Sequence, residues 1–189
     1  DARPKFAARI SETPKPPKVR ANIADRNGIL LATSLPTAAL YANPNHVLDA
    51  RLAAKRLHKV LPELDEAALA KKLSGKSTFV WLHRNLTPDR QFKVNALGVP
   101  GLYFQGMERR VYPHGALAAH VLGVTDIDGN GLSGVEKQFD GQLTGGDSAF
   151  GLSLDIRVQA MFRDALLRQQ NRFSAIGAVG VLMDVSNGE

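Results

Sequence analysis

The sequence predicts an α+β fold, assembled from strands and short helices. Two observations carry this prediction. Two apolar stretches flank Asn27-Gly28, a dipeptide suited to tight turns, and predict a strand–turn–strand hairpin from Arg20 to Pro44. Farther along, apolar residues recur at the spacing of amphipathic helices, between stretches that are typical of extended chain. The chain has 189 residues, of which 44% are hydrophobic, so it can bury a core.

Two short amphipathic helices are predicted after the hairpin, over 45–61 and 65–73. The first has its apolar residues near helical spacing: Val47, Leu48, Leu52, Leu57 and Val60. A short strand over 78–84 follows. The next helix, over 87–98, is well marked, because Thr87 is a capping residue, Pro88 suits the first helical position and Gly98 can end the helix.

The second half of the chain is predicted as extended chain over 101–113 and a short helix over 115–123. Ser133 and Glu136 form a capping box, in which each side chain bonds the backbone N–H of the other, so a helix is expected over 133–143. A linker over 144–151 leads to a helix over 155–173 that is capped by Asp155. A buried strand over 175–185 then runs into an Asn-Gly turn. A hairpin turn without its return strand indicates truncation.

The run 126–137, "DIDGNGLSGVEK", resembles a calcium loop, with Asp126, Asp128 and Asn130 at alternate positions and a glycine at the sixth. Such a loop needs a bidentate carboxylate at its twelfth position, because calcium takes roughly six to eight oxygen ligands. The twelfth residue is Lys137, and the glutamate comes one place too early. We therefore interpret this run as a loop and a helix entry.

The formal net charge of +6 is concentrated in one segment. The first twenty residues carry six basic and two acidic side chains, a net +4, which leaves +2 for the remaining 169. This segment is rich in proline and without apolar periodicity, so 1–19 is predicted to be an extended basic tether, either near anionic lipid or simply solvated. A basic nucleic-acid-binding module is the less favoured alternative, because the folded part carries little of the charge. No apolar run is long enough for a membrane span, and the amino terminus of the sequence lacks the apolar block of a secretory signal.

Candidate catalytic, metal and cofactor sites are not found. The five histidines never pair at the i, i+4 spacing of a helical zinc site, and no cysteine is present. The glycines form neither a phosphate loop nor a dinucleotide fingerprint, and no serine lies in a nucleophile elbow. We expect no catalytic residue, no metal and no cofactor.

Several charged residues lie beside glycines or turns. Asp25 and Arg26 precede the hairpin turn, Arg110 precedes a Tyr-Pro pair, and Glu136 lies in the first turn of a helix. They could be a turn, a solvated pair and a cap. Alternatively they could form a buried polar network, in which Arg20 or Arg110 meets Glu136 as a bidentate pair. The sequence leaves both interpretations open.

Three motifs resemble the non-catalytic amino-terminal region of a class B penicillin-binding protein. The first, "RANIADRNG", contributes Arg20, Asp25, Arg26 and Gly28. The second, "RVYPHGALAAHVLG", contributes Arg110, Tyr112, Pro113, Gly115, His120 and Gly123. The third, "GLSGVE", contributes Gly131, Gly134 and Glu136. Many family members have glycine where this chain has Ala21.

The resemblance implies an elongated pedestal of strands and short helices over 20–150, with a small head over about 46–105. Residues 151–189 would begin a transpeptidase domain, of which this chain has only the first helix and strand. The family's serine motifs S-x-x-K, S-x-N and K-T-G are absent, so this chain is expected not to be an enzyme and not to bind penicillin, although its parent would be a peptidoglycan transpeptidase.

The implied role is to position the transpeptidase domain on the periplasmic side of the inner membrane and to contact division proteins, notably the membrane glycan polymerase. The membrane anchor would precede this chain. The run "DGNGLSGVEKQFDGQLTG" is more similar to the division-specific branch than to the elongation branch, which is the alternative.

Overall fold

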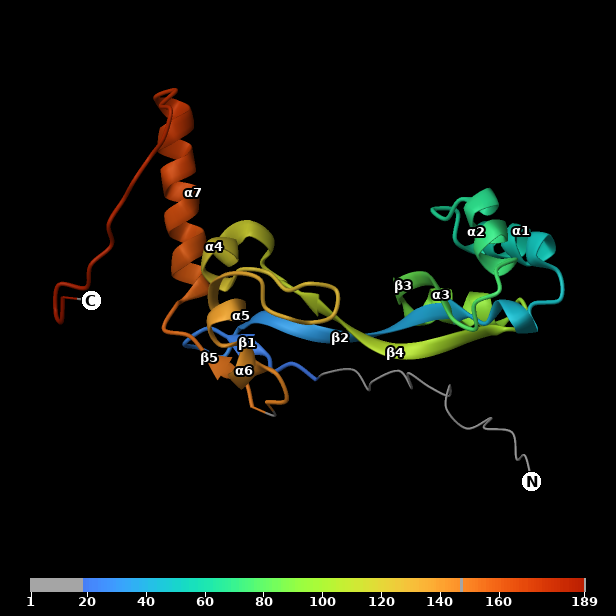
Figure 1. Cartoon of the computed structure of the whole chain (residues 1–189). Helices are drawn as coiled ribbons and strands as arrows, with labels where there is room; N and C mark the ends of the chain where they lie inside the picture. Colours follow the sequence, from blue (N-terminus) through green and yellow to red (C-terminus); the bar gives the residue numbers. More distant parts are fainter. Residues whose placement is uncertain (1–18, 147, 189) are drawn as a thin grey trace. The chain divides into compact units, whose positions relative to one another are not determined.

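The structure is a computed structural model of the chain, and it describes residues 19–146 and 148–188 (Figure 1). The predicted basic tether, 1–19, lies outside the described residues except for Val19. The folded chain divides into two compact units. We call 34–111 the first unit, and 20–33 together with 112–188 the second unit. Strand β2, Leu30–Ala42, begins in the second unit and continues into the first.

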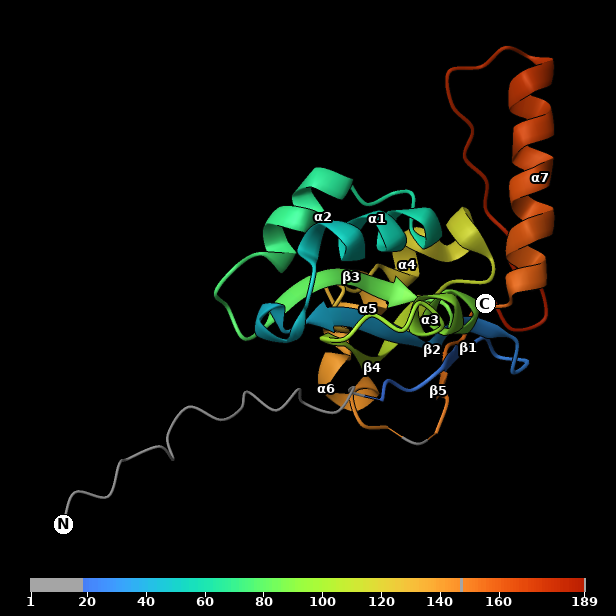
Figure 2. The ribbon, with the colours of Figure 1, turned by 90° about the vertical axis from the view of Figure 1, so that its right-hand side faces the viewer.

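The first unit packs helices on a small sheet. Strands β3 (Val80–Leu86) and β4 (Leu102–Val111) both pair with β2, and β3 runs antiparallel to it. Helices α1 (Ala50–Val60) and α2 (Glu66–Leu73) lie over one face of β2 and β3 (Figure 2). Together with α3 (Pro88–Asn95) they bury an apolar core. Its fully buried members include Leu40, Leu57, Leu61, Leu86 and Val94.

The predicted helices of this unit are confirmed, with two changes of boundary, one of which is that α3 ends at Asn95 and not at Gly98. Thr87 caps α3, Pro88 opens it, and Asp65 caps α2. The first helix starts later than expected, because the Asp49 side chain accepts a hydrogen bond from the Leu52 N–H and caps α1 at this point. A single turn of 3₁₀ helix, η1 (Pro44–His46), precedes it.

The predicted hairpin is confirmed, but its turn differs from the two-residue form. Strand β1, Ile23–Ala24, pairs antiparallel with β2. The Gly28 N–H donates to the Asp25 carbonyl, and Gly28 has a φ of 81°, whereas Asn27 does not enter the left-handed region. The Asp25 carboxylate accepts the Asn27 N–H at 2.8 Å and so fixes this residue in a longer turn with glycine at its left-handed position.

The second unit contains short helices and one long one. These are η2 (Gly115–Ala118), α4 (Ala119–Leu122), α5 (Gly134–Gln138), α6 (Asp140–Leu143) and α7 (Ile156–Arg172). The expected linker over 144–151 contains a strand, β5 (Phe150–Gly151), which is parallel to β1. It forms because the Phe150 N–H donates to Asn22 O, and the Leu152 N–H donates to Ala24 O. A second apolar core is buried here, with Ile23, Leu31, Leu122, Leu143 and Ile156.

The buried strand predicted over 175–185 is wrong. This segment has no regular structure, and the side chains of Ile176, Val179 and Val181 are exposed. A strand needs a neighbour for its backbone hydrogen bonds, and in the described part of the chain no strand lies beside it. The segment touches α7 at Gly180, where an added Cβ would lie 2.5 Å from the Phe162 ring. The α+β fold class itself is confirmed.

Among the described residues, none of the helices combines the length and the apolar character needed to cross a bilayer.

Candidate functional site

A buried ion pair joins the first and third sequence motifs. The Arg20 backbone forms a β-bridge with Thr144, which brings its side chain to α5. Arg20 Nε lies 2.7 Å from Glu136 Oε2, and Arg20 Nη2 donates to the Glu136 backbone carbonyl at 2.7 Å. Arg20 is 5% exposed and Glu136 is 0% exposed. The guanidinium thus holds one carboxylate oxygen and the backbone carbonyl of the same residue, and the buried pairing of Arg20 with Glu136 that the sequence left open is formed.

Further acceptors complete the surroundings of the Arg20 guanidinium. Its Nη1 lies 2.7 Å from Asp140 Oδ1, and it also donates to the carbonyl of Gly129 and the hydroxyl of Thr144. The hydroxyl of Tyr112, from the second motif, donates to Glu136 Oε1 at 3.4 Å. We call Arg20, Tyr112, Glu136 and Asp140 the polar network. Because burying a charge is costly without partners, these contacts are what allow a buried arginine here.

The predicted capping box is wrong. Ser133 is the residue before α5, but its side chain caps no N–H of that helix. Its hydroxyl instead accepts a hydrogen bond from the Val124 N–H at 3.2 Å. The Glu136 side chain turns away from the helix start toward Arg20, because the buried guanidinium offers a charged partner and a backbone N–H only a neutral one.

Glycines of the second and third motifs let backbone segments approach closely around the network. A Cβ on Gly131 would lie 2.0 Å from the Glu136 carbonyl oxygen, and one on Gly123 would lie 2.0 Å from the Ser133 carbonyl oxygen. Gly134 is equally restricted, with the Val121 carbonyl at 2.5 Å. Real Cβ atoms do not approach this closely, so any side chain at these positions would separate the segments that carry Glu136.

The other end of the first motif holds the start of α7. Asp25 Oδ1 accepts the N–H groups of Asn27 and Ile29 at 2.8 Å, and its Oδ2 accepts the Ile156 N–H at 3.2 Å. Burial tends to raise the pKa of Asp25, but these backbone donors outweigh it and hold the pKa below its ordinary value. Asp155, the cap of α7, also accepts from the Asn27 amide. The pKa of Asp155 is lowered, first by its hydrogen bonds from the Arg157 side chain.

The remaining motif residues have the following contacts. Arg26 and His120 have exposed side chains, and the Arg26 N–H donates to the Leu154 carbonyl. Pro113 and Gly115 form the turn after β4, in which Gly115 has a φ of 55° and donates to the Tyr112 carbonyl. Arg110, on β4 in the first unit, donates to the Ser34 hydroxyl at 3.3 Å.

The loop that resembles a calcium site uses its first carboxylate internally. Asp126 Oδ1 accepts the N–H groups of Asp128 and Asn130, and Oδ2 accepts the Asn130 amide. The Asn130 side-chain bond is the main reason that the pKa of Asp126 is lowered. Across residues 19–146 and 148–188, no three histidine, aspartate or glutamate side chains gather as a metal site would require.

Two contacts of the first motif, one at Arg20 and one at Asp25, were missed in the sequence. Asp140 lies four residues after Glu136, so both can face the same side of a helical segment, and this spacing was the available signal. The contact between Asp25 and Ile156 spans 131 residues, and no local pattern predicts it.

Comparison with known proteins identifies the family. Residues 15–155 match the model of the penicillin-binding protein dimerisation domain. The chain belongs to this family. It is 38% identical over 90% of its length to a probable peptidoglycan D,D-transpeptidase FtsI of Caulobacter vibrioides, and covers 29% of that protein. It is 32% identical over 96% of its length to the probable transpeptidase PenA of Neisseria meningitidis, and covers 36% of it. The family member thus spans about a third of the length of these curated relatives.

Solved structures show the same fold. The penicillin-binding protein PBP2 of Helicobacter pylori matches with a TM-score of 0.59 at 18% identity, over 80% of this chain and 38% of that one. PBP2 in its complex with MreC from the same bacterium matches with a TM-score of 0.62 at 20% identity, over 82% and 38%. The resemblance to the amino-terminal region of class B penicillin-binding proteins is therefore confirmed.

Proposed function

We propose that this chain is the non-catalytic part of a cell-division penicillin-binding protein, which positions a peptidoglycan transpeptidase domain. The first motif, 20–28, supports this role: one end bonds α5 and α6 through Arg20, and the other bonds the start of α7 through Asp25. In this proposal, as the resemblance implies, a transpeptidase domain begins within 151–189. A segment that bonds the start of α7 to α5 and α6, as 20–28 does, would hold such a domain in place.

The polar network makes the attachment of the segment 20–28 to α5 and α6 rigid. A buried charge that loses its partner is strongly destabilised, so the bonded arrangement is favoured over alternatives in which α5 or α6 shifts away from Arg20. The glycines at positions 123, 131 and 134 contribute to it, since they permit close backbone packing around Glu136. In this proposal the chain positions the transpeptidase domain, and a serine outside this chain would be the nucleophile of the transpeptidase reaction.

A division role is favoured over an elongation role by the relatives. The proteins named FtsI match at 38% identity in Caulobacter vibrioides and 32% in Escherichia coli, whereas the PBP2 structures match at 18–20%. We place the parent protein on the periplasmic side of the inner membrane, with division proteins as its partners and the membrane glycan polymerase foremost among them. The PBP2–MreC complex supports protein partners for related penicillin-binding proteins.

The test uses the parent protein in its source bacterium. Glu136→Gln combined with Arg20→Met should leave labelling of the parent by fluorescent penicillin intact but produce filamentous cells, because the transpeptidase domain would be present and misplaced. Glu66→Gln, on the exposed surface of α2, is the matched control and should divide normally. Normal division with the double variant would contradict the positioning role. Spherical instead of filamentous cells on depletion of the parent would assign it to elongation.

A further inference from the structure

The solvent-facing side of α1 carries a concentrated positive charge. This helix has no acidic residue, and its exposed side includes Arg51, Lys55, Arg56 and Lys59. Arg51, Lys55 and Lys59 are spaced four residues apart, so they form one row of like charges. Arg51 also lies in the first turn, where the helix dipole disfavours a cation. These side chains make no ion pair with any described residue. Their mutual repulsion lowers the stability of the fold, so the fold itself gives no reason for this arrangement of charges.

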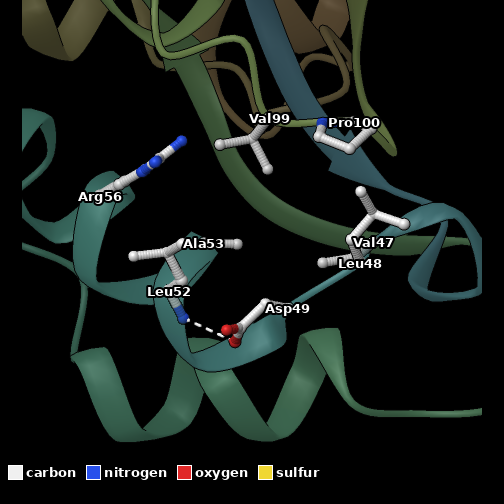
Figure 3. Close-up of a pocket in the computed structure, with 8 residues that line it drawn as sticks. All are labelled: Val47, Leu48, Asp49, Leu52, Ala53, Arg56, Val99 and Pro100. Atoms are coloured by element: carbon white, nitrogen blue, oxygen red, sulfur yellow. Dashed lines mark hydrogen bonds between the residues drawn. The ribbon is translucent and has the colours of Figure 1, made fainter.

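An apolar groove lies beside α1, and Arg56 of that helix is among the residues that line it. Its volume is about 120 Å³, comparable with an engineered apolar cavity of about 150 Å³ that holds benzene, so it suits one leucine or aromatic side chain. Figure 3 shows Arg56 extending from α1 toward Val99 at its rim. The apolar lining is formed by Val47, Leu48, Leu52, Val99 and Pro100. Leu48 is 91% exposed, so its side chain is accessible to a partner.

The groove is held open by the backbone around it. The Asn43 N–H donates to the Gly101 carbonyl at 2.8 Å and joins the two loops that form its walls. Gly101 has a φ of 83°, and a Cβ there would lie 2.9 Å from the His46 carbonyl carbon, so the loops are in close contact. Asp49 also lines the groove, and its carboxylate is held by the Leu52 N–H at the start of α1, whereas Arg56 has no described ion-pair partner.

We propose that α1 and this groove form a docking surface for an acidic segment of a partner protein, which inserts one apolar side chain. The row of cations selects carboxylates, and the groove selects a projecting leucine or aromatic group. A bilayer surface fits less well, because a concave groove takes a side chain that projects from its partner. Nucleic acid fits less well too, since no aromatic ring lines the groove for stacking. This inference goes beyond the proposed function and does not require a transpeptidase domain.

The experiment selects displayed random peptides of about twelve residues on the immobilised 189-residue chain, and then measures binding of a fluorescein-labelled enriched peptide by anisotropy. Enriched peptides should combine several acidic residues with a leucine or aromatic residue. Arg56→Glu should weaken binding by at least about tenfold, and about 0.5 M salt should do likewise. Leu48→Ser should also weaken it, without harm to the fold, because Leu48 is exposed.

The matched control is Lys71→Glu, a charge reversal on the exposed surface of α2, which should change the affinity by less than about twofold. The proposal is overturned if no peptide is enriched, if the enriched peptides lack acidic residues, or if Lys71→Glu and Arg56→Glu act equally. It is also overturned if phosphatidylglycerol vesicles, or a second copy of the chain in sedimentation, bind this surface and Arg56→Glu abolishes that binding. None of these outcomes bears on whether cells with the Glu136 variants filament, so failure of this proposal can be distinguished from failure of the proposed function.

Discussion

Glu136→Gln is the most informative single change, because it removes a charge and almost no volume. Glu136 is fully buried and its carboxylate lies 2.7 Å from Arg20 Nε, so the variant leaves Arg20 without its buried counter-charge. Removing one partner of a buried pair costs about 3–5 kcal/mol. Asp140 remains 2.7 Å from Arg20 Nη1 with its side chain 41% exposed, so we expect a value near the lower end, about 3 kcal/mol.

The assay must report on the second unit. Trp81 is the only tryptophan and lies in the first unit. Its fluorescence alone would therefore report the unfolding of the first unit, whereas Glu136 lies in the second. Native-state hydrogen exchange resolves this difficulty, since the amides of Leu143 and Phe150 donate to backbone carbonyls within the second unit. The free energy of opening at these amides should fall by about 3 kcal/mol in Glu136→Gln. Trp81 fluorescence in denaturant is recorded beside it.

Glu66→Gln is the control, because Glu66 lies in the first turn of α2 and is exposed. It should cost only a few tenths of a kcal/mol, the scale of one exposed charge near a helix end. A loss for Glu136→Gln no larger than this would refute the account of a buried network. Arg20→Met should be strongly non-additive with Glu136→Gln, since both remove the same interaction.

Four further predictions concern other parts of the chain. Gly131→Ala should lower the stability of the second unit by about 1–3 kcal/mol, because its Cβ would meet the Glu136 carbonyl; amide exchange measures this loss. The pKa of Asp25 is lower in the folded chain, so its stabilising contribution is present above the unfolded pKa of about 3.9 and is lost as pH falls through the folded value. Denaturant midpoints between about pH 5 and pH 3 should therefore fall more steeply in the wild type than in Asp25→Asn. Calorimetry should detect no calcium binding in the micromolar range, because Lys137 stands at the position of the bidentate ligand. Fluorescent penicillin should not label this chain covalently, since the serine motif is absent.

Each of these has a contradicting result. Gly141→Ala is the control for Gly131→Ala, because a Cβ there meets nothing within 4 Å, and equal effects would argue against the close approach. Parallel pH profiles for wild type and Asp25→Asn would remove Asp25 from the acid response. Saturable calcium uptake that is lost in Asp128→Ala would restore the metal loop. A penicillin adduct that survives denaturation would show that the chain has a nucleophile of its own.

Local signals in the sequence determined the helices with capping residues. Thr87 and Asp155 accept backbone N–H groups in the structure as their positions predicted, because a cap depends on neighbours two or three residues away. The same logic failed at Ser133 and Glu136, where the pattern S-x-x-E is present and the capping box is not formed. A buried guanidinium from residue 20 competes for the glutamate, and a local motif carries no information about such a distant partner.

The sequence by itself determined the α+β class, the hairpin at 27–28 and the three motifs that mark the family. The tertiary structure decided which charges meet. It brought Arg20 to Glu136 and Asp140 across more than a hundred residues, and it bonded Asp25 to the start of α7. It also decided that the apolar segment after α7 forms no strand, since apolar character predicts burial only where a partner is present. Capping and turns depend on adjacent residues, whereas the pairing of buried charges and strands depends on segments that only the folded chain brings together.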